Sequence, residues 1–363
     1  MKASRWLIVA VLMLAAAAIA AEVVCPECGA PLTVTVSKVE AEPEPEPVIS
    51  VLPQGVGVWK VDSRPEFLAW LREHYDWNQN WSGAYSDKGL PYIYEVKSTR
   101  LQDIQQLDNW LSGHVQNENF RGINLNCESG WSDEAQEMFD HVRETYPAVK
   151  IFTGPIGWAG HLASRERFAQ FDGLVHFYNV AYDNRMPEDL YYFFALAGYY
   201  GKPVVMGVQP QIQEGTLADA TLFAEGLKIS GLSESAVVWA SVRLFDAPES
   251  EQRTAIIAAI DGWERQPVRV VKRIPLSADP QANWRYDMSL ARIVGMAGYM
   301  PCFVEAGDEA DITWADIQKP EEYGKVQSYW YDKGRPGRPD NMREIVREME
   351  EQMAQALREE AGL

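Results

Sequence analysis

The sequence feature that most constrains the fold is a steady alternation of strand-like and helix-like patterns between residues 56 and 263. Eight short apolar segments are predicted as strands: 56–62, 81–85, 91–97, 121–128, 149–154, 173–178, 203–209 and 236–244. Amphipathic stretches between most of them are predicted as helices: 64–74, 101–114, 132–146, 165–171, 187–200, 216–230 and 250–263. This alternation indicates an α/β fold, and eight repeats predict a (β/α)8 TIM-type barrel.

A doubly wound open sheet is the alternative fold, because it also alternates strands with helices. Folds of that kind commonly carry a glycine-rich phosphate-binding turn after an early strand. The sequence has no such turn after any of its early predicted strands. The barrel is therefore the favoured architecture.

The residues before the barrel are predicted to be a signal and a spacer. Residues 1–21 combine two basic residues, an apolar run and the small-x-small pattern Ala18-Ile19-Ala20, which is typical of a secretory signal peptide. Residues 22–54 contain a Cys-x-x-Cys knuckle and an acidic linker in which Pro and Glu alternate. We therefore expect a secreted, periplasmic or cell-envelope protein without an integral membrane domain. Retention of the signal as an uncleaved anchor is the alternative.

The barrel is expected over residues 55–265, and residues 266–363 are predicted to form an α-rich C-terminal extension. The extension contains a predicted strand at 268–275, a helix at 288–298 and a charged helix at 341–360. The apolar residues of the last helix are spaced for docking on one side, either on the barrel or on a helical partner. The sequence leaves open whether the extension packs on the barrel or forms a separate module.

Composition and cysteine spacing argue against several partners and cofactors. The net charge of −19 argues against nucleic acid or an anionic membrane surface. Cys25 and Cys28 resemble half of a zinc site, but neither Cys127 nor Cys302 belongs to the second pair that such a site needs. A local disulfide or a relic is the favoured interpretation. The five histidines show no metal-ligand spacing, so no metal or other cofactor is expected.

The segment from Phe120 to Glu128 is the strongest functional signal in the chain. Read as a strand, it places apolar side chains on one face and polar side chains on the other. The apolar face carries Ile123, Leu125 and Cys127, and the polar face carries Asn124, Asn126 and Glu128. A buried parallel strand normally carries apolar residues on both faces. The polar column therefore predicts one wall of an active site or of a sugar-binding cleft.

Two further predicted strands, 173–178 and 236–244, end at the same barrel mouth and carry aromatic and polar residues. Aromatic rings stack on the apolar face of a sugar, while polar groups bind its hydroxyls. This combination predicts a carbohydrate site. The residues predicted to bind substrate, on these strands or just after them, are Tyr178, Tyr182, Asp183, Trp239 and Arg243.

The segment 120–128 resembles the strand-four signature of glycoside hydrolase family 18, which includes chitinases, endo-N-acetylglucosaminidases and spore-cortex lytic enzymes. A Tyr after strand six (Tyr178 or Tyr182) and a Trp in strand eight (Trp239) extend the resemblance over about residues 56–263. The resemblance implies hydrolysis of an N-acetylhexosamine-containing glycan such as chitin or peptidoglycan. The nucleophile in that family is the acetamido group of the substrate.

The resemblance also implies roles for individual residues. Glu128 would protonate the glycosidic oxygen, and Asn126, in the same column as Asn124, would orient the acetamido group. The Tyr would donate a hydrogen bond to the acetamido oxygen, and Trp239 would form the floor of the sugar subsite. Gln209 stands at the end of predicted strand seven, where some retaining glycosidases carry a nucleophile. Its neutral amide agrees with a mechanism that uses no protein nucleophile.

Asn126 is the main departure from the family signature, which has Asp at this position. A neutral amide cannot offset positive charge in the transition state, and losing such support costs on the order of a hundredfold in rate. The second hypothesis is therefore a catalytically inactive barrel that binds glycan or serves as an envelope scaffold. Glu128 would then form a salt bridge with Arg243 or another mouth residue, and Trp239 would pack in the core. His176 is predicted to be a hydrogen-bonded interior residue.

Overall fold

The computed structural model describes residues 23–24, 31–32, 52–59, 64–80, 89–97, 104–126, 132–154, 168–178, 185–213, 216–239 and 241–362. The chain divides into two compact units, residues 1–49 and 50–363. In the first unit, strand β1 (Val23–Val24) pairs antiparallel with β2 (Pro31–Leu32). The predicted signal peptide, Cys25, Cys28 and the acidic linker lie outside the described residues. Within the ranges given above, no helix is both long enough and apolar enough to cross a membrane.

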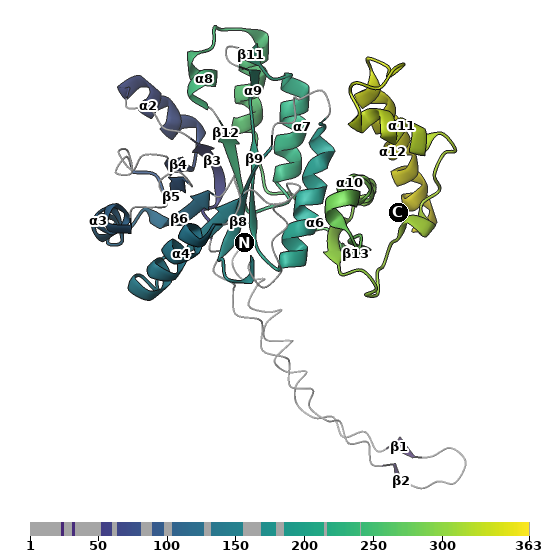
Figure 1. Cartoon of the computed structure of the whole chain (residues 1–363), viewed down its shortest axis with the longest axis horizontal. Helices are drawn as coiled ribbons and strands as arrows, with labels where there is room; N and C mark the ends of the chain where they lie inside the picture. The colour runs from purple at the N-terminus through teal and green to yellow at the C-terminus, as the bar shows by residue number, and fades with distance from the viewer. Residues whose placement is uncertain are drawn as a thin grey trace. The chain divides into compact units, whose positions relative to one another are not determined.

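The second unit contains a closed barrel of eight parallel strands (Figure 1). The strands are β3 (Gly55–Trp59), β4 (Trp77–Asn80), β5 (Tyr92–Lys97), β6 (Phe120–Asn126), β7 (Ile151–Gly154), β8 (Gly173–Tyr178), β9 (Val204–Val208) and β12 (Ser235–Trp239). Strand β12 pairs with β9 on one side and with β3 on the other, so no barrel strand is left as an edge. The predicted (β/α)8 barrel is confirmed, and the open sheet is excluded.

Helices surround the barrel, and several begin or end where the sequence predicts a cap. They are α2 (Pro65–His74), α3 (Ile104–His114), α4 (Asp133–Thr145), α6 (Leu190–Tyr200) after the short helix η2 (Pro187–Asp189), α7 (Ala220–Ser230), α8 (Ser241–Asp246) and α9 (Glu251–Asp261). Ser132 accepts a hydrogen bond from the backbone N–H of Ala135 at 3.3 Å, which caps α4. Gly201 ends α6 in the left-handed conformation, with φ of 65°. Strands β10 (Gln211–Gln213) and β11 (Thr216–Leu217) form a small hairpin before α7.

Three predicted elements of the barrel differ from the structure. The second barrel strand is β4, whereas the sequence predicted a strand at residues 81–85, which lie outside the described residues. The sequence of β4, Trp-Asn-Gln-Asn, is mostly polar and does not show the apolar pattern of a buried strand. The last strand ends at Trp239 instead of continuing to residue 244, because residues 241–246 form helix α8. Val242 and Phe245 are three residues apart and both pack on the helical layer, a spacing that a helix provides. Helix α7 starts at Ala220 instead of residue 216, because Asp219 caps it.

Two apolar cores lie on the two sides of the barrel wall. On the outer side, strand residues such as Val58, Ile123 and Leu125 pack in one cluster with the surrounding helices. The second cluster takes a residue from nearly every strand, so it fills the barrel interior: Leu52, Trp59, Trp77, Ile93, Phe152, Val175, Val205 and Val237, with Trp239 against it. A Cβ atom on Gly57 would lie 2.2 Å from the Trp77 ring, so the indole fits inside the barrel only beside a glycine.

The C-terminal extension belongs to the same compact unit as the barrel. It contains β13 (Val271–Pro275), α10 (Pro280–Met296), β14 (Met300–Val304), η3 (Trp314–Asp316), α11 (Tyr323–Tyr331) and α12 (Met342–Glu360). Strands β13 and β14 pair in parallel, and both β14 and α10 pack against α6. Figure 1 shows α10 beside α6. The question that the sequence left open is therefore answered: the extension packs on the barrel. The helix predicted at 288–298 begins earlier, at Pro280.

Candidate active site at the carboxyl end of the barrel

Polar side chains replace apolar ones in the barrel interior toward the carboxyl ends of the strands. Gln79 and Glu95 lie two residues after the interior residues Trp77 and Ile93, so they share the same inward face. Asn124 lies in register between Glu95 on β5 and the interior Phe152 on β7. Gln209 continues the inward face of β9. All four are buried, with exposed fractions of 0% (Gln79), 1% (Glu95), 1% (Asn124) and 7% (Gln209).

A carboxylate and two indoles form one side of this polar interior. Oε2 of Glu95 accepts a hydrogen bond from Nε1 of Trp59 and another from Nε2 of Gln79, the latter at 3.3 Å. Trp59 and Trp239 are the last residues of neighbouring strands and lie in register. Their ring centroids are 5.2 Å apart with an interplanar angle of 65°, an edge-to-face contact. The two indoles and the carboxylate thus lie together at the end of the barrel where (β/α)8 enzymes bind substrate.

Three amide oxygens in the same interior lack a hydrogen-bond donor. Oδ1 of Asn124, Oε1 of Gln79 and Oε1 of Gln209 are buried and accept no hydrogen bond from any described residue. Buried polar atoms are usually paired, because leaving one unpaired costs about 1–3 kcal/mol. Acceptors held open beside aromatic rings suit a ligand rich in O–H and N–H donors. A sugar is such a ligand.

The structure places the predicted catalytic column only in part. Asn124 faces the barrel interior, as the alternation of its strand predicts. Asn126 is the last residue of β6 and lies in register with Lys97 and Gly154; its side chain is outside the described part of the chain. Glu128, Tyr182 and Asp183 also lie outside the described residues, so their roles stay predictions.

The predicted substrate-binding residues separate into two groups. Trp239 lies against the interior cluster, next to Trp59. Arg243 does not continue that strand: it lies on α8 and is exposed, because the strand ends at Trp239. The prediction that Arg243 lies on the same strand as Trp239 is therefore wrong.

Tyr178 and His176 point away from the barrel interior, toward the helices. Val175 faces inward, so the alternation of β8 turns both rings outward. The Tyr178 hydroxyl donates to Oδ2 of Asp189, and only 4% of the residue is exposed. The prediction that Tyr178 lies at the mouth with the other substrate-binding residues is therefore corrected.

His176 is fully buried and stacks on Phe193 with ring centroids 3.7 Å apart. Burial, with a smaller effect from the Arg185 charge, lowers the pKa of His176 to about 3. Neither of its ring nitrogens has a hydrogen-bond partner among the described residues, which differs from the hydrogen-bonded histidine that we predicted. The ring is therefore a neutral packing element.

Three residues of the interior site escaped the sequence analysis: Trp59, Gln79 and Glu95. A signal for Glu95 was present, because a carboxylate interrupts the inward face of the predicted strand 91–97 in the way that Asn124 interrupts 121–128. Gln79 had no such signal, since β4 itself was missed. From the sequence, Trp59 is indistinguishable from an ordinary core residue. Only its hydrogen bond to Glu95 shows that it also belongs to the polar interior site.

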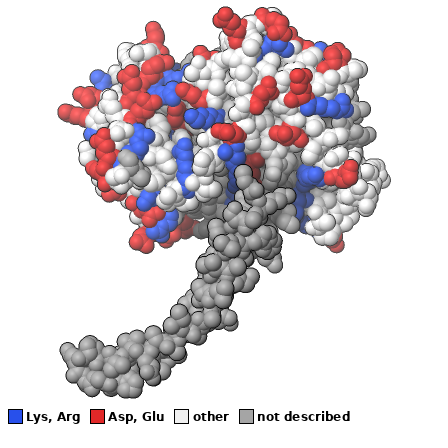
Figure 2. All heavy atoms as spheres, turned by 180° about the vertical axis from the view of Figure 1, so that it is seen from behind, with Lys and Arg blue, Asp and Glu red and all other residues white. Residues whose placement is uncertain are grey.

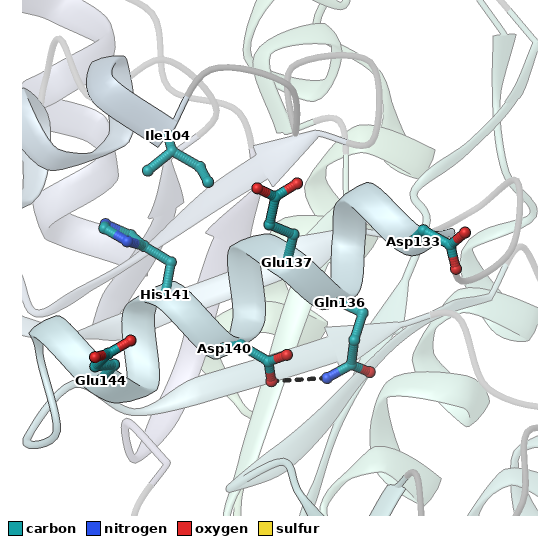
Figure 3. Close-up of a pocket in the computed structure, with 7 residues that line it drawn as sticks. All are labelled: Ile104, Asp133, Gln136, Glu137, Asp140, His141 and Glu144. Carbon is teal, nitrogen blue, oxygen red and sulfur yellow. Dashed lines mark hydrogen bonds between the residues drawn. The ribbon is translucent and has the colours of Figure 1, made fainter.

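A separate acidic pocket lies on the outer surface between α3 and α4 (Figure 3). Its cavity of about 490 Å³ is lined by Ile104, Asp133, Gln136, Glu137, Asp140, His141 and Glu144. His141 pairs with Asp108 at 2.7 Å, and Gln136 donates to Asp140 at 2.9 Å. Among the described residues, no three His, Cys, Asp or Glu side chains are arranged to hold a metal ion.

Comparisons with known proteins assign no family to this chain. No family model matches it, and no curated protein matches it. Two solved structures with which it shares some similarity are a Rhizomucor miehei β-1,3-glucanosyltransferase mutant in complex with laminaritriose and an endo-β-N-acetylglucosaminidase from Cordyceps militaris. The first is 12% identical with a TM-score of 0.38 over 51% of this chain and 86% of that chain. The second is 13% identical with a TM-score of 0.37 over 57% of this chain and 79% of that chain. Values this low assign no activity, and the barrel assignment rests on the strand pairing.

Proposed function

We propose that this protein is an exported glycoside hydrolase that acts on N-acetylhexosamine-containing glycan, with Glu128 as the proton donor. One observation carries the proposal: the carboxyl half of the barrel interior combines Glu95, open amide acceptors and two indoles. Strand β6, whose sequence resembles the family 18 signature, contributes Asn124 to this interior and ends two residues before Glu128.

The chemistry of this interior suits a sugar better than other ligand classes. The edge-to-face pair of Trp59 and Trp239 offers apolar surface to a pyranose ring, and the amide oxygens accept from its hydroxyl and N–H groups. Acidic and basic side chains are interspersed over the face seen in Figure 2, and the net charge is −19. The negative net charge and the mixed surface charges favour a glycan over a nucleic acid as the partner.

The proposed reaction is acid catalysis assisted by the substrate. Glu128 donates its proton to the glycosidic oxygen as the bond from that oxygen to the anomeric carbon breaks. The acetamido carbonyl oxygen of the same sugar forms a bond to the anomeric carbon, which gives a positively charged oxazolinium ion. Water then attacks the anomeric carbon as the bond from this carbon to the acetamido oxygen breaks, which restores the acetamido group, and Glu128 accepts a proton from the water. Asn126 orients the acetamido group, and Tyr182 takes the tyrosine role, since Tyr178 points toward the helices.

The second candidate function is a glycan-binding barrel without catalysis. Asn126 favours it, because the amide lacks the charge that the family signature has at this position. Under this alternative the interior binds sugar through the same indoles and amides. The two functions therefore differ in turnover and not in binding.

Turnover of N-acetylglucosamine oligomers by the wild type, Glu128→Gln and Glu118→Gln decides between them. Glu118 is exposed and precedes the amino end of β6, so its replacement is a matched control at the opposite end of the strand. We expect Glu128→Gln to lose at least a hundredfold in kcat, in line with removal of a general acid, and Glu118→Gln to match the wild type. Equal turnover by all three proteins, or binding without turnover by the wild type, would overturn the hydrolase proposal.

A further inference from the structure

Glu95 is a carboxylate built into the barrel interior, on a strand that the family resemblance does not involve. It is 1% exposed, and its Oε2 accepts from two neutral donors, Trp59 and Gln79. Hydrogen bonds donated to a carboxylate oxygen favour the ionised form. The structure therefore places a carboxyl group in the polar interior, with two donors directed at one of its oxygens.

Strand register relates this carboxyl group to the position where the family signature has Asp. Glu95 lies in register with Asn124, and two residues further along the strands Lys97 lies in register with Asn126. Along the strand direction, Glu95 is thus two residues before the position in register with Asn126, on the neighbouring strand. A Glu side chain is one methylene longer than that of Asp, so its carboxylate lies farther from its own strand.

We propose that Glu95 supplies the negative charge that Asn126 lacks, so that the charge-balancing carboxylate of the site lies on β5 instead of β6. This inference rests on the proposed function. Its physical basis is that positive charge develops at the anomeric carbon and in the oxazolinium ion. In an interior with little water, a nearby ionised carboxylate stabilises such charge far more than it would at the surface. The open oxygens of Asn124 and Gln79 add negative potential in the same place.

A cycle of four proteins tests this assignment: the wild type, Glu95→Gln, Asn126→Asp and the double variant. Glu95→Gln keeps one oxygen to accept from Trp59 and Gln79, removes the charge and replaces the other oxygen with an NH2 group. We expect its kcat to fall about a hundredfold with KM changed by less than threefold, as for loss of one charge-stabilising group. Asn126→Asp in the Glu95→Gln background should restore at least tenfold. In the wild-type background, Asn126→Asp should raise kcat by a smaller factor, since two neighbouring carboxylates cannot both remain ionised at low cost.

Glu188→Gln is the matched control, because Glu188 is also buried, at 4% exposure, but lies outside the barrel interior on η2. It should keep the wild-type kcat. An unchanged kcat for Glu95→Gln, or a double variant as slow as Glu95→Gln, would overturn the assignment. A purely structural role would lower the thermal midpoint and would not be rescued by a carboxylate on another strand.

A binding measurement separates failure of this inference from failure of the proposed function. A protonated iminosugar carries the positive charge of the transition state, whereas the neutral N-acetylglucosamine trimer does not. We expect the wild type to bind the iminosugar at least tenfold more tightly than Glu95→Gln does, and the two to bind the trimer equally. A wild type that binds without turnover would overturn only the hydrolase proposal. Equal iminosugar affinity in both proteins would overturn the role of Glu95.

Discussion

Two buried polar clusters in the same compact unit differ in how completely their hydrogen bonds are made. The barrel interior holds open acceptors on Gln79, Asn124 and Gln209. The second cluster surrounds Arg292 of α10 and joins the C-terminal extension to the barrel. Its polar atoms, so far as the described residues show, all have partners.

Arg292 is fully buried, and every edge of its guanidinium is used. Nε and Nη2 each donate to Glu350 at 2.6 Å, Nη1 donates to Asp189 at 2.7 Å, and Nη2 also donates to Ser289 at 3.1 Å. The two carboxylates accept further hydrogen bonds from the hydroxyls of Tyr323 and Tyr178. The network thus links α12, α11 and α10 to the end of β8.

The comparison shows what each cluster is for. A closed network stabilises one arrangement of the elements that it joins, and it offers nothing to a ligand. An open one costs stability in the free protein and recovers that cost when a ligand supplies the missing donors. The Arg292 cluster therefore holds the extension on the barrel, and the interior cluster is the candidate binding site.

The largest expected effect is the loss of the closed network. Arg292→Met should lower the free energy of unfolding by about 3–5 kcal/mol, because it leaves Glu350 and Asp189 buried without their cation. Urea denaturation of the whole chain measures this. Arg64→Met removes a pair with Asp246 whose side chains are 37% and 48% exposed, and should cost less than about 1 kcal/mol. Equal losses in the two variants would contradict the view that the buried network holds the extension in place.

An intermediate effect is expected at His176, which lies on β8 and stacks on Phe193 of α6. Its folded pKa of about 3 is below its unfolded value, so the unfolded chain binds a proton that the folded chain does not. Stability should therefore fall as pH decreases below about 6.5, by about 2 kcal/mol between pH 7 and pH 5. His176→Phe should remove this part of the pH dependence in urea titrations at both pH values. The same slope in wild type and variant would show that His176 is protonated in the fold.

The smallest effect separates the clusters by its sign. Gln327→Met removes a donor to Ser289 at 2.7 Å in the closed network, and should lower the free energy of unfolding by about 1–2 kcal/mol. Asn124→Leu removes an open acceptor from the barrel interior, and should leave this free energy unchanged or raise it by up to about 1 kcal/mol. Glycan affinity should be reduced in Asn124→Leu and unchanged in Gln327→Met. A larger loss of stability in Asn124→Leu would mean that the interior cluster is structural.

The barrel itself was predictable because eight apolar segments alternate with amphipathic helices at a regular spacing. The exceptions have local causes. Strand β4 was missed because its sequence, Trp77 to Asn80, is mostly polar, and its burial comes from closure of the barrel. Residues 241–246 alternate between apolar and polar side chains as a strand does, but they form a helix. Over only six residues, a helix and a strand can give a similar pattern.

The candidate site was predictable only along single strands. The alternation along β6 correctly predicted that Asn124 points into the barrel interior. The outward direction of Tyr178 is seen only in the structure, from its hydrogen bond to Asp189 and from the pairing of β8 with β9. Glu95 and Trp59 are 36 positions apart in the sequence, and only barrel closure brings them together. The roles of Glu128, Asn126, Tyr182 and Asp183 stay predictions from the sequence.

By itself, the sequence determined the fold class, because local periodicity specifies which segments are strands or helices and which face of each is apolar. It also determined the polar column of β6, a property of one strand. Only the tertiary structure decided which columns share the barrel interior, because strand register and closure set which faces meet. The same is true of the Arg292 network. Its charges are 58 and 103 positions from Arg292 in the chain and become partners only when the extension packs on the barrel.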